Sequence, residues 1–317
     1  MYHEFFGLRE APFRITPNTD FFFTGGNRGA ILDALLYAIS QGEGIVKVTG
    51  EVGSGKTMLC RMLQARLPPE VVSVYLANPS VSPDEIVHAI AHELELDLRP
   101  DAGRLEATQR LTALLLDCHA SGSQVVLFVE ESQSMPVATL EEIRLLSNLE
   151  TDRHKLLQIV LFGQPELDAL LRRPDIRQLR ERITHSFALA PLSAIDIGLY
   201  LNFRMRAAGY RGPDVFGPRV VKAIAGASAG LTRRVNLLGD KTLLAAFSET
   251  THAVSTRHVR AAIRDSEFAQ SATVAPSSRW RAPIAAGALA VAGVLVATLW
   301  VIDFTARPRG GTGDVPG

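Results

Sequence analysis

The sequence of 317 residues predicts an α/β domain built on a five-stranded parallel sheet, followed by a small all-helical domain and one C-terminal transmembrane helix. Three observations predict this organisation. Five short apolar runs alternate with helical patterns between residues 45 and 190, only helical patterns follow from Ser193 to Phe268, and the segment from Ile284 to Ile302 carries no charge. Strands that alternate with helices are typical of a parallel sheet covered on both faces.

The predicted strands are short runs rich in Val, Ile, Leu and Phe. They lie at residues 45–49, 71–76, 125–129, 157–162 and 185–189. Amphipathic stretches separate them, and one begins with Ser82, a helix-capping residue type, directly before Pro83. Because the alternation stops around Pro191, we expect the α/β domain to cover residues 1–191 and the helical domain residues 192–270.

The apolar segment 284–302 is long enough to span a membrane, since it would form a helix of about 28 Å. Trp280 and Trp300 lie near its two ends, as is typical of membrane interfaces. A buried core helix is the alternative, but the segment is apolar on all faces and follows the loop-like residues 271–283, which we expect to be a linker.

Basic residues before this segment predict its orientation. Arg279 and Arg281 precede it, and positive charge is typical of the cytoplasmic side. The sequence therefore predicts a single-pass protein of the inner (cytoplasmic) membrane, with residues 1–280 in the cytoplasm. Residues 303–317 are rich in Gly and Pro, and we expect them to form a short disordered tail.

Charge and cysteine content narrow the function classes. The 33 Lys and Arg residues balance 33 Asp and Glu residues, which disfavours nucleic acid as a partner of the whole chain. Cys60 and Cys118, the two cysteines, lie in apolar periodic stretches, so a disulfide framework is not expected. The first ten residues lack the basic start and apolar core of a signal peptide.

The motif GEVGSGKT, from Gly50 to Thr57, fits the phosphate-loop pattern and lies between a predicted strand and a predicted helix. In such a loop backbone N–H groups surround phosphates, Lys56 reaches the β- and γ-phosphates, and Thr57 is a ligand of Mg²⁺. A tight glycine-rich turn is the alternative interpretation. The residues expected to bind ATP are Gly50, Glu51, Val52, Gly53, Ser54, Gly55, Lys56, Thr57 and Met58.

Adjacent carboxylates follow the third apolar run. Glu130 comes directly after VVLFV and Glu131 is next. In phosphate-loop enzymes such acids hold the metal and orient the attacking water. We therefore expect Glu130 to contact Mg²⁺ through water and Glu131 to orient or deprotonate the attacking water, the alternative being two solvated acids at a helix start. Glutamate replaces the usual aspartate at the first position, which leaves the rate of hydrolysis open.

Longer segments resemble the secretion-type AAA+ ATPases of the ExeA/GspA family, most closely the MshM group of pilus-biogenesis ATPases. The resemblance covers residues 1 to about 268 and rests on MYHEFFGLREAPFRITPNTDFFF, GEGIVKVTGEVGSGKTMLCRML, EESQSM, SNLETDRHKLLQIVLFGQPEL, RQLRERI and GLTRRVNLL. It implies a P-loop NTPase core of the AAA+ type followed by a helical lid. It also implies a homo-oligomer, a ring or a dimer.

The resemblance assigns further roles by position. Gln164 falls where the family has its first sensor, and Arg180 and Arg182 fall in the segment that carries the finger inserted into the next subunit's site. The alternative for these two arginines is a solvated surface helix. Arg233 falls at the second sensor of the lid, with Arg234 beside it. The N-terminal aromatic segment either wraps the nucleotide base or packs in the core.

Two departures from the family are Glu130 and Thr232, which stands where the family usually has proline before the sensor arginine. The resemblance implies a membrane-anchored ATPase that uses ATP and Mg²⁺ to assemble a type IV-like (MSHA) pilus or a type II secretion machine with inner-membrane partners. One alternative is a nucleotide-gated regulatory or adaptor protein with little turnover. Another is a DNA-associated ATPase of the transposition type, which the neutral charge and the apolar segment disfavour.

Overall fold

The computed structural model describes residues 2–76, 78–99 and 102–266, which fall within one compact unit. The expected transmembrane segment 284–302, with its linker and tail, lies outside the described residues. Within those three ranges, no helix is both long enough and apolar enough to cross a membrane.

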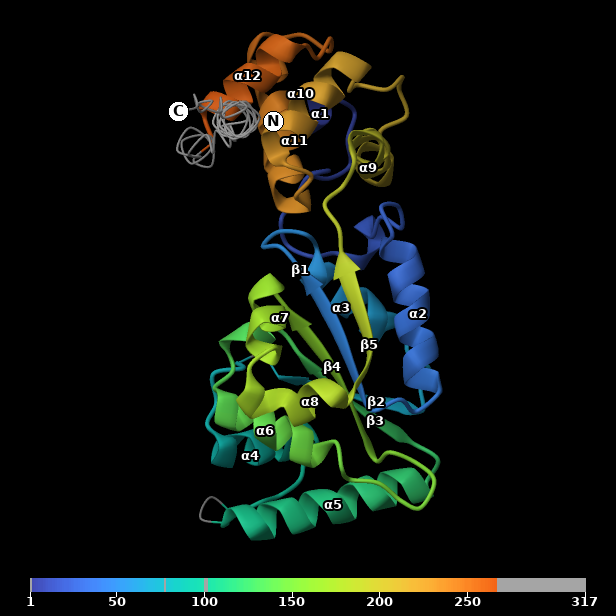
Figure 1. Ribbon diagram of the computed structural model, residues 1–317. Helices are drawn as coiled ribbons and strands as arrows, with labels where there is room; N and C mark the ends of the chain where they lie inside the picture. The colour runs from blue at the N-terminus through green and yellow to red at the C-terminus, as the bar shows by residue number, and fades with distance from the viewer. Residues whose placement is uncertain (1, 77, 100–101, 267–317) are drawn as a thin grey trace, which may run out of the picture. The chain divides into compact units, whose positions relative to one another are not determined.

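Five parallel strands form one sheet in the order β2-β3-β4-β1-β5 (Figure 1). The strands are β1 (Ile45–Gly50), β2 (Val71–Leu76), β3 (Gln124–Val129), β4 (Leu157–Gly163) and β5 (Ile183–Leu189). The predicted five-stranded parallel sheet is therefore confirmed. The order inserts β1 between β4 and β5, with Val48 opposite both Phe162 and Phe187, so the loop after β1 begins at the sheet's carboxyl edge between the ends of these two strands.

Alternate side chains of the strands enter two separate apolar layers. Val126, Phe128, Val160 and Phe162 pack with the helices of one face, whereas their neighbours along β3 and β4 pack with those of the other. The first face is covered by α2 (Arg28–Ser40) and α3 (Lys56–Arg66), and the second by α4 (Pro83–Glu93), α5 (Arg104–Ala120), α6 (Val137–Leu146), α7 (Pro165–Leu171) and α8 (Arg177–Glu181). Figure 1 shows the first group of helices on one side of the sheet and most of the second group on the other.

The chain after β5 is helical, as the sequence predicts. It forms α9 (Ala194–Ala207), α10 (Pro218–Ser228), α11 (Thr232–Ser248) and α12 (Thr256–Arg264). The buried side chains of these helices form one apolar cluster. The N-terminal segment, with α1 (Tyr2–Phe5) and the 3-10 helix η1 (Thr19–Phe21), packs into this cluster through Phe6, Leu8 and Phe13. The start of the chain thus completes the core of helices that lie about two hundred residues later.

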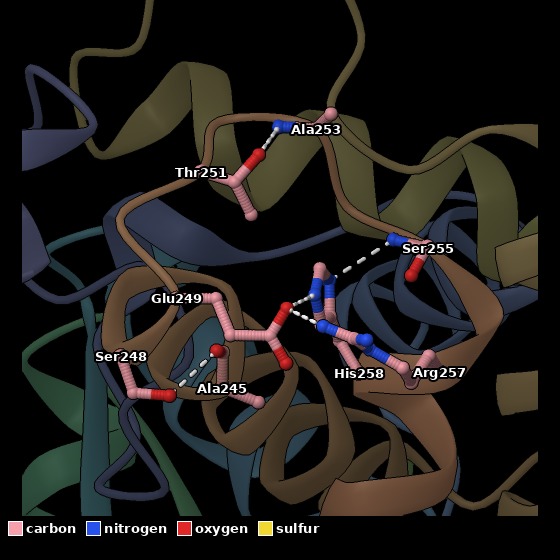
Figure 2. Close-up of polar contacts among 8 residues, drawn as sticks. All are labelled: Ala245, Ser248, Glu249, Thr251, Ala253, Ser255, Arg257 and His258. Atoms are coloured by element: carbon pink, nitrogen blue, oxygen red, sulfur yellow. Dashed lines mark hydrogen bonds and ion pairs between the residues drawn. The ribbon is translucent and has the colours of Figure 1, made fainter.

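Side-chain caps fix where several of these helices begin. Ser82 is the N-cap of α4, as the sequence predicts, and it forms a reciprocal capping box with Glu85. At the start of α12 the residue in the glutamate position of the box is His258, whose Nδ1 accepts from the Ser255 N–H. Figure 2 shows the other ring nitrogen directed at the carboxylate of Glu249, which also pairs with Arg257. This cluster fastens α12 to the end of α11.

Candidate functional site

A cavity of about 330 Å³ lies beside the loop that joins β1 to α3, a volume within the range of small-molecule sites. Its walls come from the N-terminal segment, the loop, the acid after β3, and helices α9 and α11. The lining residues are Arg14, Ile15, Pro17, Phe21, Phe22, Phe23, Arg28, Val52, Gly53, Gly55, Lys56, Thr57, Met58, Glu131, Tyr200, Arg204, Thr232, Arg233 and Asn236. The cavity therefore combines cations and glycines on one side with aromatic rings on another.

The loop from Gly50 to Thr57 has the backbone that its glycines predict. Gly53 and Gly55 have φ of 78° and 104°, values that favour glycine. Lys56 begins α3 with its side chain only 7% exposed, and its Nζ donates to the carbonyl oxygens of Gly50 (2.8 Å) and Glu51 (3.2 Å). Burial lowers the pKa of Lys56, although Glu131 and Glu130 oppose that shift.

The nine residues expected to bind ATP divide into two groups. Six of them line the cavity: Val52, Gly53, Gly55, Lys56, Thr57 and Met58. The other three residues accept hydrogen bonds through their backbone carbonyls: Lys56 donates to those of Gly50 and Glu51, and Arg28 donates to that of Ser54. The loop thus presents its lysine, its threonine and two glycines to the cavity.

Thr57 and Glu130 meet at the carboxyl edge of the sheet. The Thr57 hydroxyl donates to Glu130 Oε2 across 2.8 Å. Glu130 is 8% exposed, and its Oε1 is buried with no hydrogen-bond partner among the described residues. A buried carboxylate oxygen without a partner, next to a hydroxyl, is a donor set that suits Mg²⁺, which takes oxygen ligands and is often held by one or two carboxylates. These two residues therefore fit the expected ion.

Glu131 is held by two amide side chains. Its Oε2 accepts from Gln133 Nε2 (2.7 Å) and from Gln164 Nε2 (2.8 Å). Burial raises the pKa of Glu131, but these two hydrogen bonds and the charge of Lys56 outweigh it, so the pKa lies below the usual value. The structure thus brings Gln164, at the end of β4, to the acid after β3. Sequence reasoning missed Gln133, although its position two residues after Glu131 was a signal.

Of the four arginines predicted from the sequence, two lie at the cavity or beside it, and the other two lie away from it. Arg233 lines the cavity, and its backbone N–H donates to the Gly53 carbonyl across 2.9 Å. Arg234 lines a smaller neighbouring pocket with Glu51. Arg180 in α8 and Arg182 at its end are exposed and do not line the cavity of their own chain.

Several cavity residues carried no sequence signal. Arg28 is 6% exposed and contacts the loop after β1. Tyr200 and Arg204 come from α9, and Tyr200 donates to Asn236 of α11 across 2.7 Å. Each lies within an ordinary helical pattern, so only their meeting in space distinguishes them.

The N-terminal aromatic segment packs in the core, as one of its two predicted roles requires, and it also lines the cavity. Phe13 and Phe21 belong to the core of the helical part. Phe21, Phe22 and Phe23 line the cavity, and the Arg204 guanidinium lies 4.6 Å from the centre of the Phe21 ring. The segment is therefore core packing on one side and cavity wall on the other.

Comparisons with known proteins agree with this architecture. Residues 39–171 match the AAA domain family. Over 254 residues, 80% of this chain, the sequence is 41% identical to General secretion pathway protein A of Aeromonas hydrophila. The match covers 46% of that protein, so the chain spans about half the length of this curated relative.

Solved structures with a similar fold are more distant in sequence. The Aeropyrum pernix ORC2 protein has a TM-score of 0.60 at 18% identity, covering 80% of this chain and 72% of that one. Cdc6p from Pyrobaculum aerophilum has a TM-score of 0.60 at 17% identity, covering 83% and 70%. At these identities the similarity shows the fold alone, an AAA+ core with a P-loop and a parallel sheet.

Proposed function

Since the chain is an AAA+ protein related to General secretion pathway protein A, we propose that it binds Mg·ATP in the cavity beside the P-loop and hydrolyses it. The observation that carries this proposal is that Lys56, Thr57 and Glu131 line one cavity, with Glu130 hydrogen-bonded to Thr57. The loop and the acids come from segments more than seventy residues apart.

Each of these residues has a role that its surroundings support. Lys56 and the amides of the P-loop would bind the β- and γ-phosphates, and Arg233 would approach them from the lid. Thr57 and Glu130 would hold Mg²⁺, which when bound neutralises negative charge that develops on the phosphates.

Glu131 is proposed as the residue that orients the attacking water and takes its proton. Gln164 and Gln133 fix the direction of its carboxylate through their hydrogen bonds. Gln164 would link this acid to α7, because its side chain contacts Glu131 and its backbone is the N-cap of that helix. A carboxylate ionised at neutral pH can accept a proton at once, although a lowered pKa makes it a weaker base.

Steady-state phosphate release by the full chain, solubilised in detergent, tests hydrolysis. We expect Glu131→Gln to bind ATP with unchanged affinity but to hydrolyse it at least about 100-fold more slowly. Lys56→Ala should lose affinity as well. Wild-type hydrolysis as slow as that of Glu131→Gln, with both proteins binding ATP, would exclude the hydrolytic function.

A nucleotide-gated regulator with little turnover is a second candidate, favoured by one specific observation. The two hydrogen bonds to Glu131 lower its pKa and so weaken it as a base. In that case ATP would still bind and alter the lid. The same phosphate-release experiment decides between the two candidates, because a regulator would show ATP binding with turnover no faster than Glu131→Gln.

We further propose that the ATPase is anchored in the inner membrane and serves assembly of a type II secretion machine or a type IV-like pilus. The support is the relation to General secretion pathway protein A and the uncharged sequence 284–302. Expression with and without residues 277–317, followed by membrane fractionation and carbonate extraction, tests the anchor. We expect the full chain in the extracted membrane and the shortened chain in the supernatant. Recovery of both in the supernatant would reject it.

We propose oligomerisation because Arg180 and Arg182 are exposed and do not line the cavity of their own chain. An arginine supplied by a neighbouring subunit stabilises charge in phosphoryl transfer. Mixing Arg180→Ala protein with Lys56→Ala protein tests this directly. Partial recovery of hydrolysis in the mixture is expected if the arginine acts between subunits, whereas no recovery would place its effect within one chain.

A further inference from the structure

Arg28, the first residue of α2, is a buried cation whose four side-chain hydrogen bonds to the described residues all go to neutral oxygens. Its Nη1 donates to the Gly26 carbonyl across 2.7 Å. Its Nη2 lies 3.1 Å from the Ser54 carbonyl, 3.3 Å from that of Ala190 and 3.4 Å from Thr232 Oγ1. The three acceptors of Nη2 belong to the P-loop, the residue after β5 and the start of α11. A buried charge of this kind is costly to desolvate, which suggests a positioning role.

Thr232 reaches the same carbonyl from the lid. Its hydroxyl donates to the Ser54 carbonyl across 3.1 Å, so Ser54 accepts from both Arg28 and Thr232. The next residue, Arg233, donates its backbone N–H to the Gly53 carbonyl across 2.9 Å. Two consecutive carbonyls of the P-loop are therefore held by two consecutive residues in the first turn of α11.

The first turn of α11 depends on these contacts, because its own cap is missing. The first N–H groups of a helix have no partner within the helix and are usually met by a side chain at the N-cap. Here the N-cap is Leu231, which has no side-chain acceptor. The Gly53 carbonyl accepts from the amide of Arg233 instead, so the P-loop itself caps the lid helix.

The P-loop and the first turn of α11 are also packed closely, so neither can move toward the other. A Cβ at Gly53 would lie 2.8 Å from the Arg233 Cβ. The loop and the helix therefore touch through backbone and hydroxyl groups, and a shift of one changes the hydrogen bonds of the other.

We propose that Arg28 and Thr232 are positioning residues that fasten the Ser54 carbonyl of the P-loop to the first turn of α11. The phosphate-binding loop and the lid then move together, and the contact depends on a hydroxyl that a proline at position 232 cannot supply. The consequence for ATP rests on the proposed function, because rearrangement of the loop around phosphate would be passed directly to α11.

Amide hydrogen exchange of the full chain without nucleotide tests the contact independently of hydrolysis. We expect Thr232→Val, which removes only the hydroxyl, to raise exchange about fivefold in segments 50–57 and 229–236, as expected for loss of one hydrogen bond. Thr232→Ser keeps the hydroxyl, so its exchange rate should equal that of the wild type. Equal rates in Thr232→Val and wild type, or equal effects of Val and Ser, would overturn the proposal.

Thr242→Val is the matched control within the same helix. Thr242 is fully buried in α11, and its hydroxyl has no hydrogen-bond partner among the described residues, so its removal should leave both segments unchanged. If Thr242→Val accelerated exchange as Thr232→Val does, general loosening of α11 would explain the result and the proposal would fail.

A double variant tests whether Arg28 and Thr232 act on the same carbonyl. Arg28→Lys keeps the charge but cannot bridge the separate oxygens, and it should accelerate exchange by itself. Combined with Thr232→Val, it should raise exchange less than the product of the two single effects, since both residues hold Ser54. A simple product would mean independent roles and would contradict the proposal.

Added Mg·ADP then separates this inference from the proposed function. In the wild type, protection should rise in both segments, whereas in Arg28→Lys/Thr232→Val it should rise only in 50–57. Protection of both segments in the double variant would overturn the coupling. No protection in any protein would reject nucleotide binding while the exchange results without nucleotide still decide the contact itself.

Discussion

The hydroxyl of Thr57 donates to the carboxylate of Glu130 across 2.8 Å, which joins the first turn of α3 to the end of β3. Glutamate is one methylene longer than aspartate, and in this site the extra length brings the carboxylate to the threonine. One carboxylate oxygen is used in that contact and the other is buried without a partner in the described part of the chain. The substitution at the usual aspartate position is therefore compatible with a metal-binding role.

Replacing Glu130 by glutamine should weaken metal binding more than folding. The amide keeps the size of the side chain but replaces one buried oxygen by N–H groups, which cannot accept from a metal-bound water. We expect hydrolysis to require at least about tenfold more Mg²⁺ for half-maximal rate, a loss of about 1.4 kcal/mol. A Mg²⁺ titration of phosphate release measures this. Glu130→Asp is the control, and an unchanged Mg²⁺ requirement in Glu130→Gln would show that Glu130 does not serve the metal.

Removing the amide of Gln164 should move the pH dependence of hydrolysis. Because this amide lowers the pKa of Glu131 by donating to its carboxylate, Gln164→Met should raise that pKa. Glu131 then becomes protonated at a higher pH, so the acid limb of the kcat/KM profile moves to higher pH. Profiles from pH 4 to 8 check the direction. A limb that stays in place would mean that Glu131 is not the base whose ionisation limits the rate.

Gly53→Ala should disrupt the P-loop and its contact with α11 together. Gly53 has a φ of 78°, and a Cβ there would meet the Arg233 Cβ at 2.8 Å. We expect a loss of about 1–3 kcal/mol in the free energy of unfolding and weaker ATP binding.

Gly226→Ala provides the contrast for that variant. Gly226 lies within α10, and a Cβ there would meet nothing within 4 Å, so alanine should stabilise the helix by up to about 1 kcal/mol. Urea unfolding and ATP titration of both variants check these signs. Equal effects of the two substitutions would contradict the close approach of the P-loop and α11.

His258→Ala should loosen α12. The buried imidazole accepts from the Ser255 N–H and contacts Glu249, so its removal leaves the cap N–H without its acceptor and takes away one of the two partners of the carboxylate (Figure 2). We expect a loss of about 1–2 kcal/mol in the free energy of unfolding. Arg257→Ala removes the exposed partner of the same carboxylate and should cost less than about 1 kcal/mol. The reverse order, measured by urea unfolding, would show that the ion pair and not the cap holds α12.

Part of the site can be predicted from short stretches of sequence. An apolar run followed at once by Glu130 and Glu131 predicts a strand with acids at its carboxyl end, because both features are local. The P-loop is predicted for the same reason, since its glycines, Lys56 and Thr57 lie between one strand and one helix. Parallel strands share a carboxyl edge, so these local predictions already imply that the loop and the acids lie on one side of the sheet.

Other parts depend on contacts between residues far apart in the chain. Phe6 and Phe13 enter the core of helices near the other end of the described chain, and no local pattern indicates this partner. The position of β1 between β4 and β5 is likewise a matter of long-range pairing.

The sequence by itself determined the order of strands and helices along the chain, the P-loop and the acid pair, since each follows from residues within a few positions of one another. Only the tertiary structure decided that Arg28, Ser54 and Thr232 meet, and that Gln133 and Gln164 share the carboxylate of Glu131. The physical reason is that a hydrogen bond between side chains on separate elements requires those elements to be packed first. Residue type and local spacing do not specify that packing.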